Sequence, residues 1–296
     1  METEKILAGI GNADMVLVGM GEDFDDGKRL QGCPGYAEGK QYLRDTGQHW
    51  LIPLWNEYCS AGMGEDVVSP VLEKLAGILA GKNYFVVATA TDSRIFKAPW
   101  KQGRLVMPCG TTLKKQCTGG CGLEEVSEEE RKRLNSFFEE LSAASLQKAD
   151  LREAGLQKAG LREAGFQKAD LREAGLQQTG FLGGGRGKLT ECRHCGRDMV
   201  LNTVYAEAYD EQGYLEQWQT YMKWLQGTIN RRLVVMELGV GMRFPSVIRW
   251  PFEKAAYFNQ KAFFIRVNER LYQMTEELSG KGCSIPKNAI AWLERL

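Results

Sequence analysis

Short apolar runs recur along the chain, and each is followed closely by glycines or small polar residues. Four of these runs predict strands that are buried on both faces of a sheet. They are Met15–Val18, Asn83–Ala88, Arg231–Leu238 and Ala262–Val267. Helix-length segments separate the runs. Because strands that alternate with helices favour a parallel arrangement, we predict an α/β fold with a doubly wound parallel sheet.

The segments between these runs carry apolar residues at helical spacing or charged amphipathic patterns. Helices are predicted at Glu4–Gly11, Gln41–Tyr58, Val67–Leu79, Ser127–Leu141 and Tyr205–Leu225. In one of them Ser127 and Glu130 have the spacing of a capping box, which marks a helix start. By contrast, Gly27–Gly39 is rich in glycine and charge, and we expect a loop there that folds over a bound ligand.

A repeated segment interrupts this pattern between Leu146 and Phe181, where an apolar residue recurs every five positions within LQKADLREAG and its variants. A five-residue step does not place these residues on one stripe of a helix. The alanine two residues before each leucine, as in Ala149-Asp150-Leu151, resembles the pentapeptide repeat of a square β-helix. The array supplies only about two coils, fewer than a solenoid needs. We therefore expect a low-complexity insertion at 145–187, loosely helical or disordered, with the β-helix as the alternative.

Length and charge narrow the functional classes. The 296 residues suffice for one large α/β domain and a smaller module. Lys and Arg together number 38, as do Asp and Glu, so no net charge attracts nucleic acid or an anionic membrane surface. No basic signal segment opens the chain and no apolar run reaches transmembrane length. Eight cysteines without such a signal favour a reducing compartment, and we expect a cytoplasmic protein.

Four of the cysteines form two pairs with the spacing of metal ligands. Cys117 and Cys121 are separated by three residues, and Cys192 and Cys195 by two. Four thiolates suit a closed tetrahedral zinc site, with no position left open for a substrate. We predict a structural Zn²⁺, and the alternative is two unrelated cysteine pairs.

Candidate chemistry lies where the predicted strands end. Gly19-Met20-Gly21 follows the first strand, and two glycines would let backbone amides approach a pyrophosphate. The third glycine of the dinucleotide fingerprint is missing, so a plain tight turn is the alternative. Asp92 ends the polar tip after the second strand, at the edge where open α/β sheets bind ligands. It is either a ligand-facing residue or an ordinary turn-capping aspartate.

The order of these parts resembles the sirtuin family over nearly the whole chain apart from the insertion. The resemblance is greatest to the bacterial branch often linked to macrodomains. It is carried by ELGVGMRFPSVIRWPFEKAAYFNQKAFFIRVN at Glu237–Asn268 and by the Gly110–Cys117 element. It implies a Rossmann-like NAD-binding domain at 1–108 and 200–296, and a small zinc-binding module at 109–199 that carries the insertion.

By the same resemblance the cofactor is NAD, and the protein transfers ADP-ribose to a protein acceptor or acts as a relaxed protein deacylase. In the macrodomain-linked branch the acceptors are lipoyl-carrier proteins. The residues that match the family's cofactor-binding positions, and their immediate neighbours, are Gly19, Met20, Gly21, Asp92, Gly239, Val240, Gly241, Asn268 and Glu269. Asp92 also matches the aspartate of the catalytic turn.

Two positions depart from the family's chemistry. Ala90 stands where the catalytic asparagine is expected, and Cys109 replaces the general-base histidine. A thiol accepts a proton only as a thiolate, so Cys109 would need a lowered pKa to act with Asp92 in catalysis. Glu22 and Asp23 after the first turn would repel a pyrophosphate unless turned away. The alternative is therefore a catalytically impaired module that binds NAD or ADP-ribose.

Overall fold

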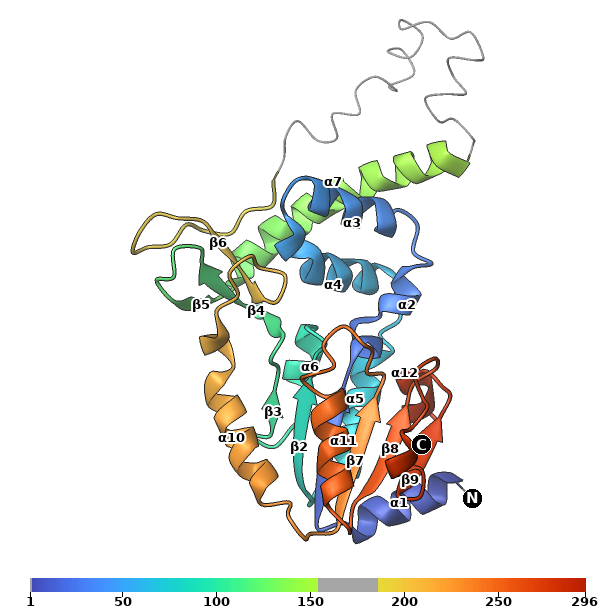
Figure 1. Ribbon diagram of the computed structural model, residues 1–296. Coiled ribbons are helices and arrows are strands. Elements are labelled where there is room, and N and C mark those ends of the chain that lie inside the picture. Colours follow the sequence, from blue (N-terminus) through green and yellow to red (C-terminus); the bar gives the residue numbers. More distant parts are fainter. Residues whose placement is uncertain (1, 154–185) are drawn as a thin grey trace, which may run out of the picture.

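The structure, a computed structural model, describes residues 2–153 and 186–296. Its largest element is a six-stranded sheet in which all neighbouring strands are parallel. The strands are β1 (Met15–Met20), β2 (Asn83–Ala88), β3 (Leu105–Val106), β7 (Leu233–Leu238), β8 (Phe263–Val267) and β9 (Gly282–Ile285). Their order is β3-β2-β1-β7-β8-β9, so the chain runs outward from β1 and then returns beside it (Figure 1). The predicted doubly wound sheet is confirmed, with its switch point between β1 and β7.

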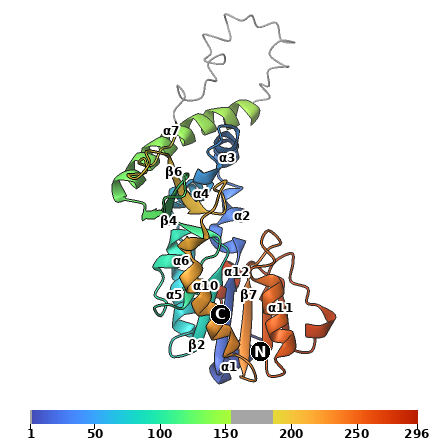
Figure 2. The ribbon, with the colours of Figure 1, turned by 60° about the vertical axis from the view of Figure 1, so that its left-hand side comes forward.

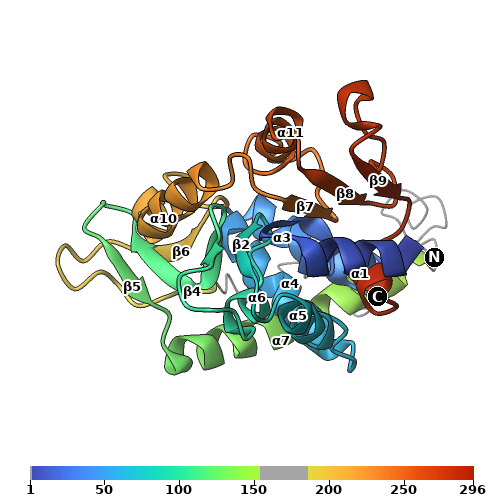
Figure 3. The same cartoon turned by 90° about the horizontal axis from the view of Figure 1, so that it is seen from below.

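Helices cover both faces of this sheet (Figure 3). One face is covered by α1 (Glu2–Asn12), α5 (Val68–Ile78) and α12 (Ala289–Leu293). The other face is covered by α10 (Leu215–Gln226) and α11 (Arg249–Phe258). Alternate side chains of β1 enter the two cores, Val16 and Val18 on the first face and Leu17 on the second. This burial on both sides is why the strands are continuous apolar runs in the sequence.

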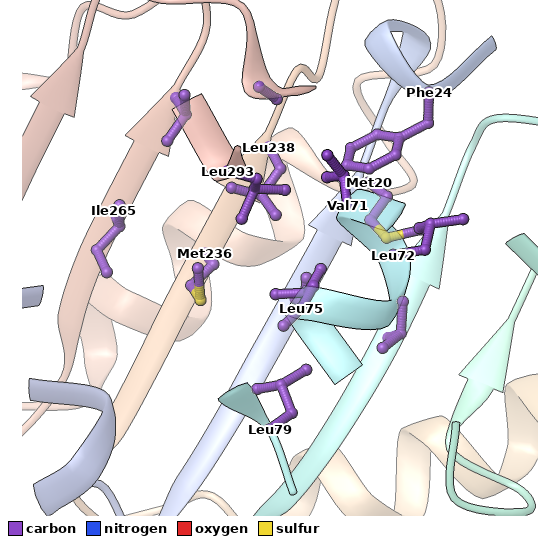
Figure 4. Packing of buried hydrophobic residues seen from close by; sticks show 14 of the residues in the cluster. Met20, Phe24, Val71, Leu72, Leu75, Leu79, Met236, Leu238, Ile265 and Leu293 are labelled. Atoms are coloured by element: carbon purple, nitrogen blue, oxygen red, sulfur yellow. The ribbon is translucent and has the colours of Figure 1, made fainter. Parts of the chain in front are cut away.

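The core beneath α5 shows how tightly helix and sheet are joined (Figure 4). Leu72 and Leu75 lie on one face of the helix and Leu79 caps its end, and all three are fully buried against the strands. Met20 at the end of β1 and Phe24 just beyond it belong to the same cluster. Each such side chain contributes about 1.5–3 kcal/mol relative to exposure. The segment that leaves β1 is therefore anchored on the core.

A second sheet lies beyond the carboxyl ends of the parallel strands (Figures 1 and 2). It is antiparallel, in the order β5-β4-β6, and consists of β4 (Gly110–Cys117), β5 (Leu123–Glu125) and β6 (Met199–Thr203). The helices beside it are α2 (Gly27–Leu30), α3 (Tyr36–Asp45), α4 (Ile52–Gly62) and α7 (Glu128–Glu153). Their common core joins Trp55, Phe138 and Leu201. Three stretches that are distant in sequence thus build this small unit.

The remaining short elements are the helix α6 (Ser93–Lys97) and the 3-10 turns η1 (Glu22–Asp25), η2 (His49–Leu51), η3 (Glu211–Gly213) and η4 (Glu276–Leu278). Among the described residues, no helix has the length and apolar character needed to cross a membrane.

Most of the predicted elements are present, with three differences. All four predicted strands form, and Ser127 and Glu130 make the reciprocal capping bonds expected at the start of α7. The loop expected at Gly27–Gly39 is wrong, because α2 and the beginning of α3 occupy that stretch. The segment Gln41–Tyr58 is divided among α3, η2 and α4, with Gly47 at φ 70° just after α3 ends. The helix expected at Tyr205–Leu225 begins only at Leu215.

Two further interpretations concern the small module. The insertion expected at 145–187 lies largely outside the described residues, but its first part, to Glu153, continues α7. The domain division at 109–199 stays a prediction, and the shared core adds α2, α3 and α4 to the neighbourhood of the small sheet.

A buried ion cluster fixes the turn that follows β7. Glu237 is fully buried and accepts hydrogen bonds from Arg266 at 2.9 and 3.0 Å and from Arg249 at 2.9 Å. Arg249 donates further to the carbonyl of Leu271 at 2.7 Å. The cluster thereby ties β7, β8 and α11 together just below the strand ends.

We expect Glu237→Gln to lower the free energy of unfolding by about 3–5 kcal/mol, because it removes the buried carboxylate that pairs with Arg249 and one of the two carboxylates that pair with Arg266. Urea unfolding followed by circular dichroism measures this. Glu253→Gln is the matched control, since Glu253 also binds Arg266, at 2.6 Å, but is partly exposed. A similar loss in both variants would contradict the role assigned to Glu237.

Candidate functional site

The parallel register brings the predicted site residues to one edge of the sheet. Met20 pairs with both Ala88 and Leu238, and Leu238 pairs with Val267, so four strands end at the same level. The turns that follow hold Gly21, Asp92, the Gly239–Gly241 segment and Asn268. Backbone hydrogen bonds continue past the strand ends, from Gly21 N to Leu238 O at 2.9 Å and from Gly239 N to Val267 O at 2.8 Å.

The glycine turns after β1 and β7 cross in close contact. A Cβ atom at position 21 would lie 2.7 Å from the carbonyl carbon of Gly239, so only glycine allows the crossing. Gly239 itself has φ 60°. Met20 and Val240 point their side chains into opposite cores, which leaves only their backbone at the turns. Gly19 lies within β1, where a Cβ would meet Phe252 of α11 at 2.8 Å, so it serves helix packing.

Two acidic side chains lie over the second glycine turn. A Cβ at Gly241 would be 2.7 Å from the carboxyl carbon of Glu22, and one at Gly239 would be 2.5 Å from Cβ of Asp23. Asp23 also accepts a hydrogen bond from the backbone N–H of Ala289, the first residue of α12, at 2.8 Å. The space next to both glycines is therefore filled by the chain's own carboxylates.

Asn268 and Glu269 stabilise the turn after β8. The side-chain oxygen Oδ1 of Asn268 accepts hydrogen bonds from the backbone N–H groups of Arg270 and Leu271, at 2.9 and 2.8 Å. Its amide donates to the carbonyl of Val240 at 3.1 Å, which links the turns after β7 and β8. Glu269 is partly exposed and pairs with Lys28, whose ammonium holds the pKa of that carboxyl below its usual value.

Asp92 is engaged by its own helix. It is 4% exposed and accepts hydrogen bonds from the backbone N–H of Arg94 at 2.8 Å and from the Arg94 guanidinium at 2.6 to 3.1 Å. This is the turn-capping arrangement named above as an alternative. Arg94 also pairs with Asp26 at 3.0 Å and Asp66 at 2.9 Å. A cavity of about 300 Å³ opens beside Asp92 and Arg94.

Asp25 was not anticipated from the sequence and is a carboxyl with a strongly raised pKa at this edge. Burial, with the nearby charge of Asp92, raises its pKa to about 7. It accepts a hydrogen bond from the backbone N–H of Thr91 at 2.9 Å. The run Asp23-Phe24-Asp25-Asp26 directly after a strand and glycine turn is the only sequence signal that could have indicated it. A carboxyl that titrates near neutral pH is suited to proton transfer.

Cys109 lies close to Asp25. Its thiol is protonated at neutral pH, so it cannot act as a base. Burial raises the pKa of its thiol to about 12, and the charge of Asp25 adds to the effect. Cys109 is thus a protonated thiol at neutral pH, and the lowered pKa that base catalysis would need is not observed. Ala90 is fully buried in the core beneath the turn.

Glu57 of α4 joins this edge to the small sheet. It accepts hydrogen bonds from Ser93 N at 2.8 Å and from Thr112 Oγ1 at 2.5 Å, and Arg131 approaches it at 3.8 Å. Burial and the charge of Asp92 raise its pKa. Thr112 belongs to β4 and Arg131 to α7, so the small unit is tied to the turn after β2 through Glu57.

The four predicted metal ligands meet at the end of the small sheet. The sulfur atoms of Cys117, Cys121, Cys192 and Cys195 all lie within 4.8 Å of one another. Cys117 ends β4, and hydrogen bonds from the backbone of Cys121 and Gly119 lower its pKa to about 6. The donor set, four cysteine sulfurs, fits a tetrahedral Zn²⁺ with no open position. Such an ion would be structural.

Three kinds of similarity to known proteins accompany this geometry. A family model described as pentapeptide repeats matches residues 140–178 in 8 copies. This confirms the repeat character of the insertion, although the copies up to Glu153 are helical. A probable bifunctional ADP-ribose hydrolase/ADP-ribosyltransferase of Fusarium oxysporum f. sp. cubense is 34% identical over 68 residues. That match covers 22% of this chain, and the chain spans only 11% of that protein.

Solved sirtuin structures match over the whole chain. Sir2Tm bound to a propionylated peptide has a TM-score of 0.54 at 11% identity, and covers 100% of this chain and 97% of its own. A structure on the basis of sirtuin substrate affinity has a TM-score of 0.53 at 12% identity, covering 100% and 98%. Sir2 bound to an acetylated peptide has a TM-score of 0.51 at 11% identity, covering 100% and 97%. The chain has the sirtuin fold, which confirms the expected fold.

The NAD implied by the resemblance fits this edge only after a rearrangement of two acidic side chains. The crossing glycines and parallel strand ends give the cradle that a dinucleotide requires. Glu22 and Asp23 occupy the space over Gly239 and Gly241, however, and a diphosphate there would meet two like charges. A nucleotide fits only if these carboxylates turn away.

We expect Cys192→Ser to abolish bound zinc, measured by metal analysis of the purified protein, which should hold one Zn²⁺ per wild-type chain. The midpoint of thermal unfolding should fall by roughly 5–10 °C, because a structural metal contributes folding energy. Cys33→Ser should keep the metal, since Cys33 lies outside the cluster. The zinc assignment would be contradicted if the wild-type protein folds without bound metal and chelators leave its midpoint of thermal unfolding unchanged.

Proposed function

We propose that the chain is an NAD-dependent protein-modifying enzyme that transfers ADP-ribose to a protein acceptor. The observation that carries this proposal is Asp25, a carboxyl with a pKa of about 7 at the strand-end edge. The sirtuin fold supports a nucleotide site at that edge. The name of the fungal relative supports the type of transfer. The resemblance to the macrodomain-linked branch makes a lipoyl-carrier protein the first acceptor to test.

Histidine-based deacylation is a poor match to the same edge. The chain has two histidines, His49 in η2 and His194 between the two cysteines of the second pair. Both belong to the small unit, and neither follows a strand of the large sheet. Cys109 stands where the resemblance places a histidine base, but it keeps its proton. Asp25 is the group at this edge that can accept a proton near neutral pH.

The proposed roles of this chain's residues are limited to binding, positioning and proton transfer. The backbone of the Gly239–Gly241 turn would bind the nucleotide, and Asn268 would hold that turn through its bond to Val240. Asp92 acts as a positioning residue, because its carboxylate orients the turn that donates a hydrogen bond to Asp25. Asp25 would accept the proton that the acceptor side chain loses.

A second candidate is a non-catalytic module that senses NAD or ADP-ribose. It is favoured by the burial of Ala90 and the protonated thiol of Cys109, which leave the family's two catalytic positions without their chemistry. The test measures the affinity for NAD and ADP-ribose by calorimetry and, in parallel, the release of nicotinamide from NAD. Tight binding without nicotinamide release would establish this candidate over the enzyme.

We expect Asp25→Asn to lower the rate of ADP-ribose transfer by roughly 100-fold or more, the usual contribution of a general base. The assay uses labelled NAD and candidate acceptor proteins, and it follows both label transfer and nicotinamide release. Asp45→Asn, an exposed site on α3, is the matched control and should keep wild-type activity. Equal rates for all three proteins would remove Asp25 from the mechanism.

The pH dependence provides an independent check on Asp25. Its pKa is raised from 3.8 to about 7 in the folded protein, so the stabilisation from its protonated form is lost as pH rises through 7. Wild-type stability should fall between pH 4 and 7 relative to Asp25→Asn, while transfer activity should rise through pH 7 as the base ionises. Parallel stability curves for the two proteins would contradict the raised pKa.

A further inference from the structure

We propose that Glu22 and Asp23 act as an internal mimic of the ligand's phosphates, and that they lower nucleotide affinity by occupying the glycine turn. This inference rests on the proposed function, because it concerns the same strand-end edge. It goes further in naming the residues that oppose binding and the part of the ligand that they oppose.

The two carboxylates lie where a diphosphate would make its closest approach. The carboxyl carbon of Glu22 lies 2.7 Å from the place of a Cβ at Gly241, and Cβ of Asp23 lies 2.5 Å from that at Gly239. Glycines usually leave such space so that a phosphate can approach the backbone. Here the carboxylates of Glu22 and Asp23 fill this space, and they carry the same negative charge as a phosphate.

The backbone of η1 is pinned, so displacement must occur through the two side chains. Phe24 stands between Asp23 and Asp25 and is fully buried in the core beneath α5 (Figure 4). At the far end of the turn, Asp26 is held at φ 54° by hydrogen bonds from Ser60 and Arg94. Rotation of the Glu22 side chain can uncover Gly241 without unfolding this segment. At Gly239, rotation moves the Asp23 carboxyl group and its charge away, while the Cβ atom of Asp23 stays beside the glycine.

The two carboxylates are held over the glycine turn by different numbers of contacts. Glu22 is exposed, and rotating it into solvent costs few contacts. Asp23 is partly buried and accepts a 2.8 Å hydrogen bond from Ala289 N, so its release breaks a contact with α12. Lys28 and Glu269, which pair with each other, are the charged groups that act on Asp23 from the neighbouring turns. Asp23 is therefore the stronger of the two competitors.

The test is the affinity for ADP-ribose, measured by titration calorimetry on the full chain. Glu22→Gln/Asp23→Asn keeps the shape and the acceptor oxygens but removes both charges. We expect it to bind ADP-ribose roughly 10–100-fold more tightly than wild type, with the larger part coming from Asp23→Asn. Asp45→Asn/Glu216→Gln removes the same charge from exposed sites on α3 and α10, and should leave the affinity unchanged.

Adenosine, which has no phosphates, should bind all three proteins equally if the effect is specific to the diphosphate. If wild type and the double variant bind ADP-ribose with equal affinity, the proposal that Glu22 and Asp23 mimic phosphates is wrong, whereas the proposed nucleotide site stands. If none of the three proteins binds ADP-ribose, although thermal unfolding curves show that all are folded, both the phosphate-mimic proposal and the proposed function are wrong. Where Asp23→Asn does not fold, Glu22→Gln alone must still bind more tightly than wild type.

Discussion

The contact between the turns after β1 and β7 is the constraint on which the rest of the strand-end edge depends. The two strands are neighbours at the switch point of the sheet, and their glycines approach so closely that no side chain fits between them. This contact directs the chain after Gly21 back across the second turn. It thereby places Glu22, Asp23 and Asp25 above the strand ends.

Burial, with the carboxylates crowded at that edge, sets the protonation of Asp25 and Cys109. Arg94 directs its donors to Asp26, Asp66 and Asp92, so these groups share one cation. Burial, followed by the charge of Asp92, raises the pKa of Asp25 to about 7. Cys109 shifts in the same direction, away from the thiolate. Burial therefore makes Asp25 a usable base and, by the same direction of shift, prevents Cys109 from acting as one.

Much of the fold could be predicted from the sequence because it rests on local patterns. Strands covered on both faces are visible as apolar runs, and the Ser127 capping box is a motif within four residues. The cysteine spacing likewise predicted the four-sulfur cluster. The strands of the small sheet were missed because β4 includes Lys114, Lys115 and Gln116, which hide its partial burial. Lys115 is buried through its ion pair with Glu130, a tertiary contact.

The chemistry of the site was less predictable because it depends on residues far apart in the chain. The raised pKa of Asp25 comes from its burial and from the charge of Asp92, and the capping role of Asp92 was one of two alternatives that the sequence left open. The repulsive character of Glu22 and Asp23 was predicted from their charge alone. Their position over Gly239 and Gly241 required the crossing of the two turns, which no local pattern encodes.

The most direct test of this account is a crystal structure of the full chain with ADP-ribose. We predict that the diphosphate lies over the Gly239–Gly241 turn, with the Glu22 side chain and the Asp23 carboxyl group rotated away and the ribose that is transferred next to Asp25. ADP-ribose bound at another surface, with both carboxylates still over the glycines, would contradict it.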